Sequence, residues 1–157
     1  MIYKNESTGL TLQISDLLLK EIIDVGIQHC PNEFGGFLIG FYSEDSKQLN
    51  ITDIILPKKY KATPYLFERD TIGVNERLRR FFKEEPKKYY VGEWHTHPQN
   101  SPIPSTTDYN AMVAISNYKN VAIKNPVLLI VGYQNKLVEL GFYVMFRNKL
   151  CRYEQQN

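Results

Sequence analysis

Two of the three histidines in this 157-residue chain, His95 and His97, stand two positions apart. On a β-strand, alternate residues point to the same face about 6.6 Å apart, so two imidazoles at this spacing can reach one ion. Imidazole nitrogens bind zinc at about 2.0–2.1 Å, and a zinc site needs further ligands. The pair therefore predicts two of the ligands of a metal ion.

Glu93 and Asp108 are the nearest candidates for a third ligand. Three alternate strand positions span about 13 Å, which is too spread for Glu93, His95 and His97 to share one tetrahedral ion. Asp108 is the better candidate, because Ser105 can open a helix whose first turn contains Asp108. A carboxylate is favoured there by the exposed amide groups and the helix dipole.

Each half of this pattern also has an ordinary structural interpretation. Ser105 to Asp108 resembles a capping box with Asp in place of Glu, and two histidines alone can form a polar strand edge. The two halves joined by the proline-rich loop from Pro98 to Pro104 favour a metal site instead.

The elements that must position these residues follow from hydrophobic spacing and turn residues. The spacing predicts helices over 15–29, 71–85 and 105–118, a loop over 57–64, and strands over 35–42, 49–56, 89–95, 127–133, 137–146 and 150–153. This order predicts a single mixed α/β (α+β) domain over residues 1–157. We expect its sheet to be dominated by antiparallel pairs and flanked by helices.

Alternation along the strand over 89–95 places Trp94 and Tyr90 on the face opposite the histidines, which favours core packing over substrate contact. In the helix over 71–85, we expect Leu78, Phe81 and Phe82 to point inward.

Four residues near the first helix and strand can be explained by structural roles. Gly35 and Gly36 fit either the close approach of a substrate backbone or a simple turn before a strand. His29 and Cys30 have no partner at metal-ligand spacing, so we expect them to be structural. Cys30 and the distant Cys151 form no paired motif, which favours reduced thiols.

The composition selects no charged partner. With 19 basic and 17 acidic residues the formal charge is +2, too small to favour nucleic acid or an anionic membrane. Glutamates interrupt the basic residues between Arg77 and Lys88, as on a solvated helix face. No apolar run approaches the roughly 18 residues of a membrane span, and no signal-peptide core is evident, so we expect a cytoplasmic protein.

His95-x-His97, the seven residues from Pro98 to Pro104, and Ser105-x-x-Asp108 together resemble the signature of the JAMM/MPN+ metalloproteases. Glu33-Phe34-Gly35-Gly36-Phe37-Leu38-Ile39-Gly40 is similar to the upstream segment of the same family. The resemblance implies a cytidine-deaminase-like MPN/JAB domain. It also implies one Zn²⁺ per chain held by His95, His97 and Asp108.

Three carboxylates, Glu33, Glu68 and Glu93, are conceivable general bases from the residues alone. The resemblance assigns this role to Glu33, which would take a proton from water and give it to the departing amine. By the same resemblance, Ser105 would donate a hydrogen bond to the developing oxyanion, a role that competes with helix capping.

The run from Tyr90 to Pro98, with Pro102 to Ser105, is similar to bacterial members encoded beside ubiquitin-type activating and conjugating proteins (E1- and E2-like). These members include the isopeptidase of CBASS anti-phage operons. The resemblance implies hydrolysis of the amide bond after the extended C-terminal tail of a ubiquitin-like modifier or conjugated protein. The segment from Lys58 to Asp70 is the candidate contact for that tail.

Two other classes remain as alternatives. A noncatalytic MPN-type scaffold would only bind partner proteins and would have no need for the ligand set and Glu33. A JAMM-like protein of the DNA-repair group would share the histidine motif, but the near-neutral charge and the absence of an added DNA-binding segment disfavour it.

Overall fold

The computed structural model describes residues 1–120 and 123–157. Within them lie the helices α1 (Asp16–Gln28), α2 (Val74–Phe81) and α3 (Thr106–Asn117). The strands are β1 (Ile2–Lys4), β2 (Thr11–Ile14), β3 (Gly35–Tyr42), β4 (Gln48–Ile55), β5 (Tyr60–Thr63), β6 (Leu66–Arg69), β7 (Tyr89–Pro98), β8 (Val127–Gln134), β9 (Leu137–Phe146), β10 (Lys149–Arg152) and β11 (Glu154–Gln155).

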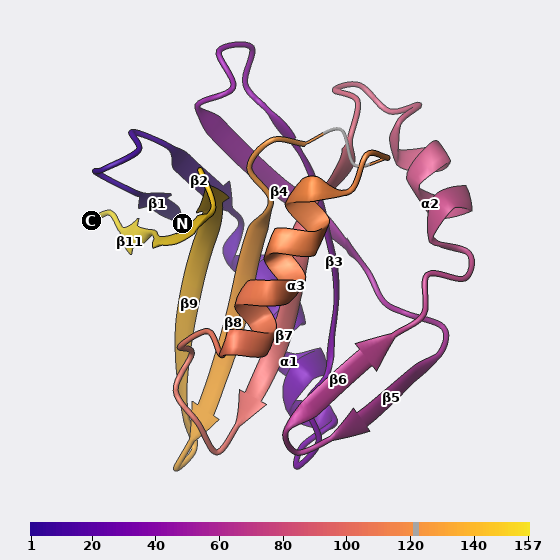
Figure 1. The fold of residues 1–157 in the computed structure, drawn as a ribbon, viewed down its shortest axis with the longest axis vertical. Helices are drawn as coiled ribbons and strands as arrows, with labels where there is room; N and C mark the ends of the chain where they lie inside the picture. The colour runs from indigo at the N-terminus through magenta and orange to yellow at the C-terminus, as the bar shows by residue number, and fades with distance from the viewer. Residues whose placement is uncertain (121–122) are drawn as a thin grey trace.

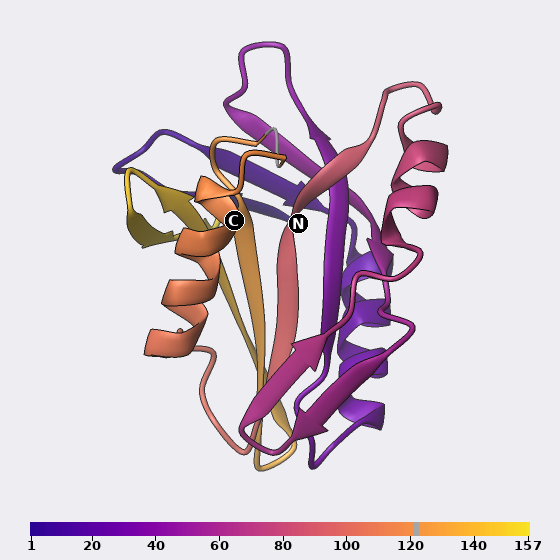
Figure 2. The same cartoon turned by 45° about the vertical axis from the view of Figure 1, so that its right-hand side comes forward.

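Nine of these strands form one sheet in the order β10-β9-β8-β7-β3-β4-β2-β1-β11, and β5 and β6 form a separate hairpin. The pairs β7–β8 and β2–β4 are parallel and the other pairs are antiparallel. Helices α1 and α3 lie on opposite faces of the sheet (Figures 1 and 2). The predicted α/β class, with a mostly antiparallel sheet flanked by helices, is confirmed.

Helix α1 begins where the sequence predicts it, because the Ser15 hydroxyl accepts a hydrogen bond from the Leu18 amide at 3.2 Å. Its buried face, which includes Leu19 and Ile22, packs into the main core of the sheet with Trp94. One face of β7 is thereby buried, which leaves the other face to carry chemistry.

Helix α2 is shorter than predicted, and one of its expected core residues is not buried. Leu78 and Phe81 pack against the cluster that contains Phe37 and Val74. Phe82, however, comes after the last helical turn and is 53% exposed, with the Lys87 ammonium 5.2 Å from its ring. The prediction that Phe82 points inward is therefore wrong.

A β-bulge in β7 corrects the expected orientation of Tyr90. Leu38 pairs with Gly92 but Ile39 pairs with Tyr90, so β7 has one residue more than β3 across this step. The extra residue reverses the alternation. Tyr90 therefore lies on the same side as Glu93, to which its hydroxyl donates a hydrogen bond at 2.8 Å. Trp94 stays on the opposite, α1-facing side and is 1% exposed.

The C-terminal segment connects the two outer strands of the sheet. Strand β10 pairs with β9 at one edge and β11 pairs with β1 at the other, with only Tyr153 between β10 and β11. Tyr153 is buried, and its amide donates to the Phe142 carbonyl at 2.8 Å. The sheet is therefore strongly curled. None of the helices in the described residues is long and apolar enough to cross a membrane.

Candidate active site

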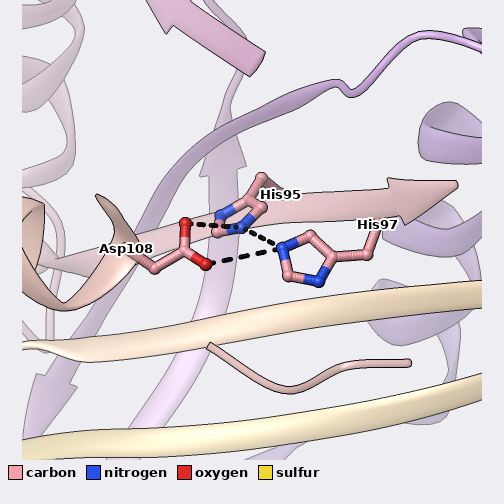
Figure 3. A group of neighbouring side chains, drawn as sticks. All are labelled: His95, His97 and Asp108. Atoms are coloured by element: carbon pink, nitrogen blue, oxygen red, sulfur yellow. Dashed lines mark hydrogen bonds and ion pairs between the residues drawn. The ribbon is translucent and has the colours of Figure 1, made fainter. Parts of the chain in front are cut away.

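His95 and His97 project from β7, and Asp108 projects toward them from the first turn of α3 (Figure 3). The two Nε2 atoms are 3.1 Å apart. Asp108 Oδ1 lies 3.2 Å from His95 Nε2, and Asp108 Oδ2 lies 3.5 Å from His97 Nε2. Because β7 is paired with β3 on one side and β8 on the other, the two imidazoles have a rigid base.

These distances fit a metal-binding group. Ligand atoms about 2.05 Å from a tetrahedral zinc ion lie about 3.3 Å from one another, close to the spacing of the imidazole and carboxylate atoms here. His95, His97 and Asp108 form one candidate cluster of ligand atoms. Glu93 is not part of it, because its carboxylate is occupied by Arg69 and Tyr90.

The ring of His97 is oriented by a backbone carbonyl. His97 Nδ1 lies 3.0 Å from the Ser101 carbonyl oxygen, so Nδ1 carries the proton and Nε2 faces the cluster with its lone pair. Burial lowers the pKa of His97, but Asp108 and the Ser101 carbonyl outweigh burial and raise it.

Asp108 is held by the start of α3 as well as by the histidines. The Ser105 amide and hydroxyl both donate to Asp108 Oδ2, at 2.7 and 2.8 Å, and the Asp108 amide donates to Ser105 Oγ at 3.1 Å. This capping box aims the carboxylate at the histidines. Burial would raise the pKa of Asp108, but the hydrogen bonds with His95, His97 and Ser105 hold it far below its ordinary value.

Glu33 lies between α1 and β3, and hydrogen bonds of Glu33 and the next residue hold the backbone in place. The Glu33 amide donates to the Thr63 carbonyl of β5 at 2.9 Å. The next residue, Phe34, is bound to β7 twice, since its amide donates to Thr96 Oγ1 at 2.9 Å and its carbonyl accepts from the Thr96 amide at 2.8 Å. Thr96 stands between the two histidines, so this contact fixes Glu33 relative to them.

The carboxylate of Glu33 makes no hydrogen bond or ion pair within the described residues, although it lines the same cavity as the histidines. Burial raises its pKa from 4.5 to about 7, with His97 opposing the shift and Asp108 adding to it. Of the other two candidate bases, Glu68 is exposed on the β5–β6 hairpin and Glu93 is neutralised by Arg69. Glu33 is therefore the carboxylate best placed to accept a proton.

A cavity of about 630 Å³ contains these groups. One wall is the β5–β6 hairpin, from Pro64 to Phe67 and at Arg69, and the opposite wall is the face of α3 with Ala111 and Ile115. Ser105 also lines the cavity, so the structure brings together all five residues singled out from the sequence: Glu33, His95, His97, Ser105 and Asp108.

Strand packing accounts for the two glycines after Glu33. A Cβ atom at Gly35 would lie 2.8 Å from His95 Cβ and collide with the Trp94 carbonyl oxygen. At Gly36 it would lie 2.6 Å from the Ile55 carbonyl oxygen. The absence of side chains thus lets β3 approach its neighbours closely, beside the ligand-bearing part of β7.

Three residues of this region were not singled out from the sequence: Arg69, Thr96 and Ser101. Thr96 could have been found, because a residue between two strand ligands faces the opposite, buried side and needs a hydrogen-bond partner. His29, by contrast, lies outside the ligand cluster, stacked on Phe34 with ring centroids 3.6 Å apart. Cys30 and Cys151 are both free thiols.

Comparison with known proteins identifies relatives over most of the chain. Residues 16–143 match a family model described as prokaryotic homologs of the JAB domain. A protein of Enterobacter hormaechei subsp. hoffmannii named CD-NTase/cGAS isopeptidase is 34% identical over 131 residues, covering 83% of this chain and 72% of that protein. A Vibrio cholerae serotype O1 protein of the same name is 28% identical over 138 residues, covering 84% and 82%.

The fold also has a solved counterpart. The solution structure of a Desulfitobacterium hafniense protein matches with a TM-score of 0.64 at 16% identity, and the match covers 91% of this chain and 90% of that one. At this level of identity the likeness concerns the fold.

Proposed function

This chain belongs to the family of prokaryotic JAB-domain homologs, and we propose that it is a zinc-dependent isopeptidase. The observation that carries the proposal is that His95, His97 and Asp108 converge in one cavity beside Glu33, whose carboxylate has no partner among residues 1–120 and 123–157. A protein that served only as a binding scaffold would have no need for a preformed ligand set next to a free carboxylate.

In the proposed mechanism the three ligands are His95, His97 and Asp108. These residues would hold a zinc ion, which would supply a coordinated water with a pKa lowered to about 7 and a Lewis acid for the scissile carbonyl. Glu33 accepts a proton from the attacking water and then donates it to the departing amine, so its carboxylate is regenerated in each cycle. Its raised pKa of about 7 suits both transfers near neutral pH.

Ser105 is the proposed donor to the oxygen that becomes negatively charged in the transition state. Ser105 lines the cavity, and its hydroxyl donates to Asp108 Oδ2 at 2.8 Å; rotation about the Cβ–Oγ bond would redirect the hydroxyl hydrogen while Oγ still accepts from the Asp108 amide. The backbone of Ser105 keeps its own hydrogen bond to Asp108 in either orientation. Helix capping and oxyanion stabilisation can therefore share this residue.

The substrate that we propose is a conjugate between the C-terminal tail of a ubiquitin-like protein and an amine of a second protein. The curated relatives are named CD-NTase/cGAS isopeptidases, and this supports a nucleotidyltransferase of that kind as the second protein, within a bacterial anti-phage system. The hairpin β5–β6, which covers most of the predicted contact segment from Lys58 to Asp70, forms a cavity wall where an extended tail would lie.

Metal analysis and a cleavage assay test the proposal together. We expect about one zinc per chain, lost in His95→Ala and in His97→Ala. We also expect wild-type protein to release the modifier from an amide-linked conjugate, with the cut site read by mass spectrometry. Glu33→Ala should keep the zinc and lose cleavage, whereas Glu44→Ala, at an exposed position in the β3–β4 turn, should keep both.

Cleavage that survives loss of both histidines would contradict a metal-dependent mechanism. Stoichiometric zinc without cleavage of any such conjugate would favour the scaffold alternative.

A further inference from the structure

The hairpin β5–β6 depends on the rest of the molecule for its position. It is a two-stranded sheet of four residues per strand, separate from the main sheet. A hairpin of this size is marginally stable by itself in water. Its place beside the ligand cluster is therefore set by its contacts with β3, β7 and the segment before β3.

Two of these contacts hold the hairpin to the segment that carries Glu33. At the tip, the Thr63 carbonyl accepts the hydrogen bond from the Glu33 amide at 2.9 Å. Along the hairpin, the rings of Tyr60 and Phe67 pack around Phe34, with centroids 5.0 and 5.5 Å from it. Any movement of the hairpin would thus be transmitted to Glu33.

The third contact is a charged one at the open end of the hairpin. The Arg69 guanidinium lies 2.5 Å from Glu93 Oε1 and 5.3 Å from the centroid of the Phe37 ring. Phe37 and Glu93 are cross-strand partners, so Arg69 covers a rung of the β3–β7 ladder just before His95. The side chain of Glu93 is only 10% exposed, and Tyr90 donates a second hydrogen bond to it.

We propose that the Arg69–Glu93 ion pair is a positioning device that fixes the β5–β6 hairpin on β7 and thereby holds Glu33 at its working distance from the histidines. The proposal rests on the proposed function in one respect, the catalytic role of Glu33. Arg69 and Glu93 themselves touch neither the ligand atoms nor the attacking water in this scheme. They act through the Thr63 carbonyl and the Phe34 aromatic contacts.

A purely electrostatic role would have different consequences. If Arg69 only neutralised buried Glu93, its removal would weaken the whole fold without a particular effect at Glu33, because an unpaired buried charge destabilises the native state as a unit. A positioning role instead loosens the hairpin first. The amide of Glu33 reports this directly, since its acceptor belongs to the hairpin.

Native-state hydrogen exchange of the Glu33 amide is the test. In Arg69→Gln we expect it to exchange at least about tenfold faster than in the wild type, while amides of central strand β8 change much less. The matched control is Arg80→Gln, which breaks the exposed Arg80–Glu76 pair of α2 and should leave the Glu33 amide unchanged. Exchange at Glu33 that rises only in step with β8 would overturn the proposal.

The double variant Arg69→Gln/Glu93→Gln keeps the test decisive if Arg69→Gln alone does not fold, because it leaves no buried charge without a partner. We expect the same selective loss of protection at Glu33. We also expect kcat to fall by about 10- to 100-fold with zinc content unchanged, as small misplacements of a catalytic group do. Wild-type protein without isopeptidase activity would refute the proposed function, whereas unchanged protection at Glu33 would refute the positioning role.

Discussion

The carboxylate of Glu33 is stabilised in its protonated form by the folded state. Burial raises its pKa from 4.5 to about 7, so the native protein binds a proton there more tightly than the unfolded chain does. Because this pKa is raised, the free energy of unfolding falls as the pH rises from about 4.5 to about 7. Above this range the native state holds a charged carboxylate that it solvates poorly. The proposed base is thus a site where function opposes stability.

Glu33→Gln should therefore stabilise the metal-free protein at high pH. With chelator present, we expect the variant to exceed the wild type by about 1–3 kcal/mol near pH 8, after allowance for partial solvation. The difference should nearly vanish near pH 4.5, the ordinary pKa of the side chain. Urea unfolding at both pH values measures it, and a gain of equal size at both would show that charge is not its cause.

The residues of the candidate metal group could be predicted because their spacing is local. Two strand positions and one helix-start position define His95, His97 and Asp108, and the structure brings all three together. The Arg69–Glu93 pair could not be predicted, since nothing near either residue indicates the other and the pairing exists only after the hairpin has docked.

At the scale of elements, the first turn of α3 combines a helix start with the proposed metal site. The hydroxyl of Ser105 caps α3 and contacts the Asp108 carboxylate, so loss of the hydroxyl could affect stability, the metal site or the reaction. Two substitutions that both remove the hydroxyl but differ in capping separate these effects.

Ser105→Ala should reduce the free energy of unfolding by about 1 kcal/mol, whereas Ser105→Gly should reduce it by only a few tenths, because glycine is tolerated at N-cap positions. If the hydroxyl donates to the oxyanion, both variants should lose about 10²- to 10³-fold in kcat to a similar extent. Thermal unfolding, zinc content and kcat measure the three effects. A Ser105→Gly variant with full activity would restrict the serine to capping.

The elements that escaped prediction are short or irregular. Strands β5 and β6 lie in a segment rich in lysine, tyrosine and proline, without the apolar alternation that marks a half-buried strand. Strands β1, β2 and β11 have between two and four residues each. Strict alternation placed Tyr90 on the wrong face of β7, because the bulge inserts one extra residue relative to the neighbouring strand β3. Long apolar strands such as β3 and β9 were predicted with their bounds.

At the scale of the whole molecule, Tyr153 joins the two outer edges of the sheet. Its side chain is 3% exposed and packs in the main core, between strands β10 and β11. Edge strands that are paired or covered are protected from adding strands of other molecules. Tyr153 therefore anchors the two outermost strands, β10 and β11, to the main core.

Tyr153→Ala should lower the free energy of unfolding by about 3 kcal/mol, as removal of a large buried side chain does. We also expect concentration-dependent association as the outer strands loosen. Urea unfolding and size-exclusion chromatography measure these effects. The control is Tyr118→Ala, which removes a tyrosine that is 58% exposed and should change stability by less than about 0.5 kcal/mol. Equal losses in the two variants would contradict this role of Tyr153.

The pairing of β1 with β11 also brings the two chain termini side by side, as Figure 1 shows, with the Gln156 amide bound to the Ile2 carbonyl at 2.9 Å. Polypeptide joined to both of these points would leave the surface at nearly one place. Such a geometry suits insertion into a surface loop of a host protein, because the host need not stretch to span the guest. The candidate active-site cavity, formed by other strands and by α3, would remain open in the resulting chimera.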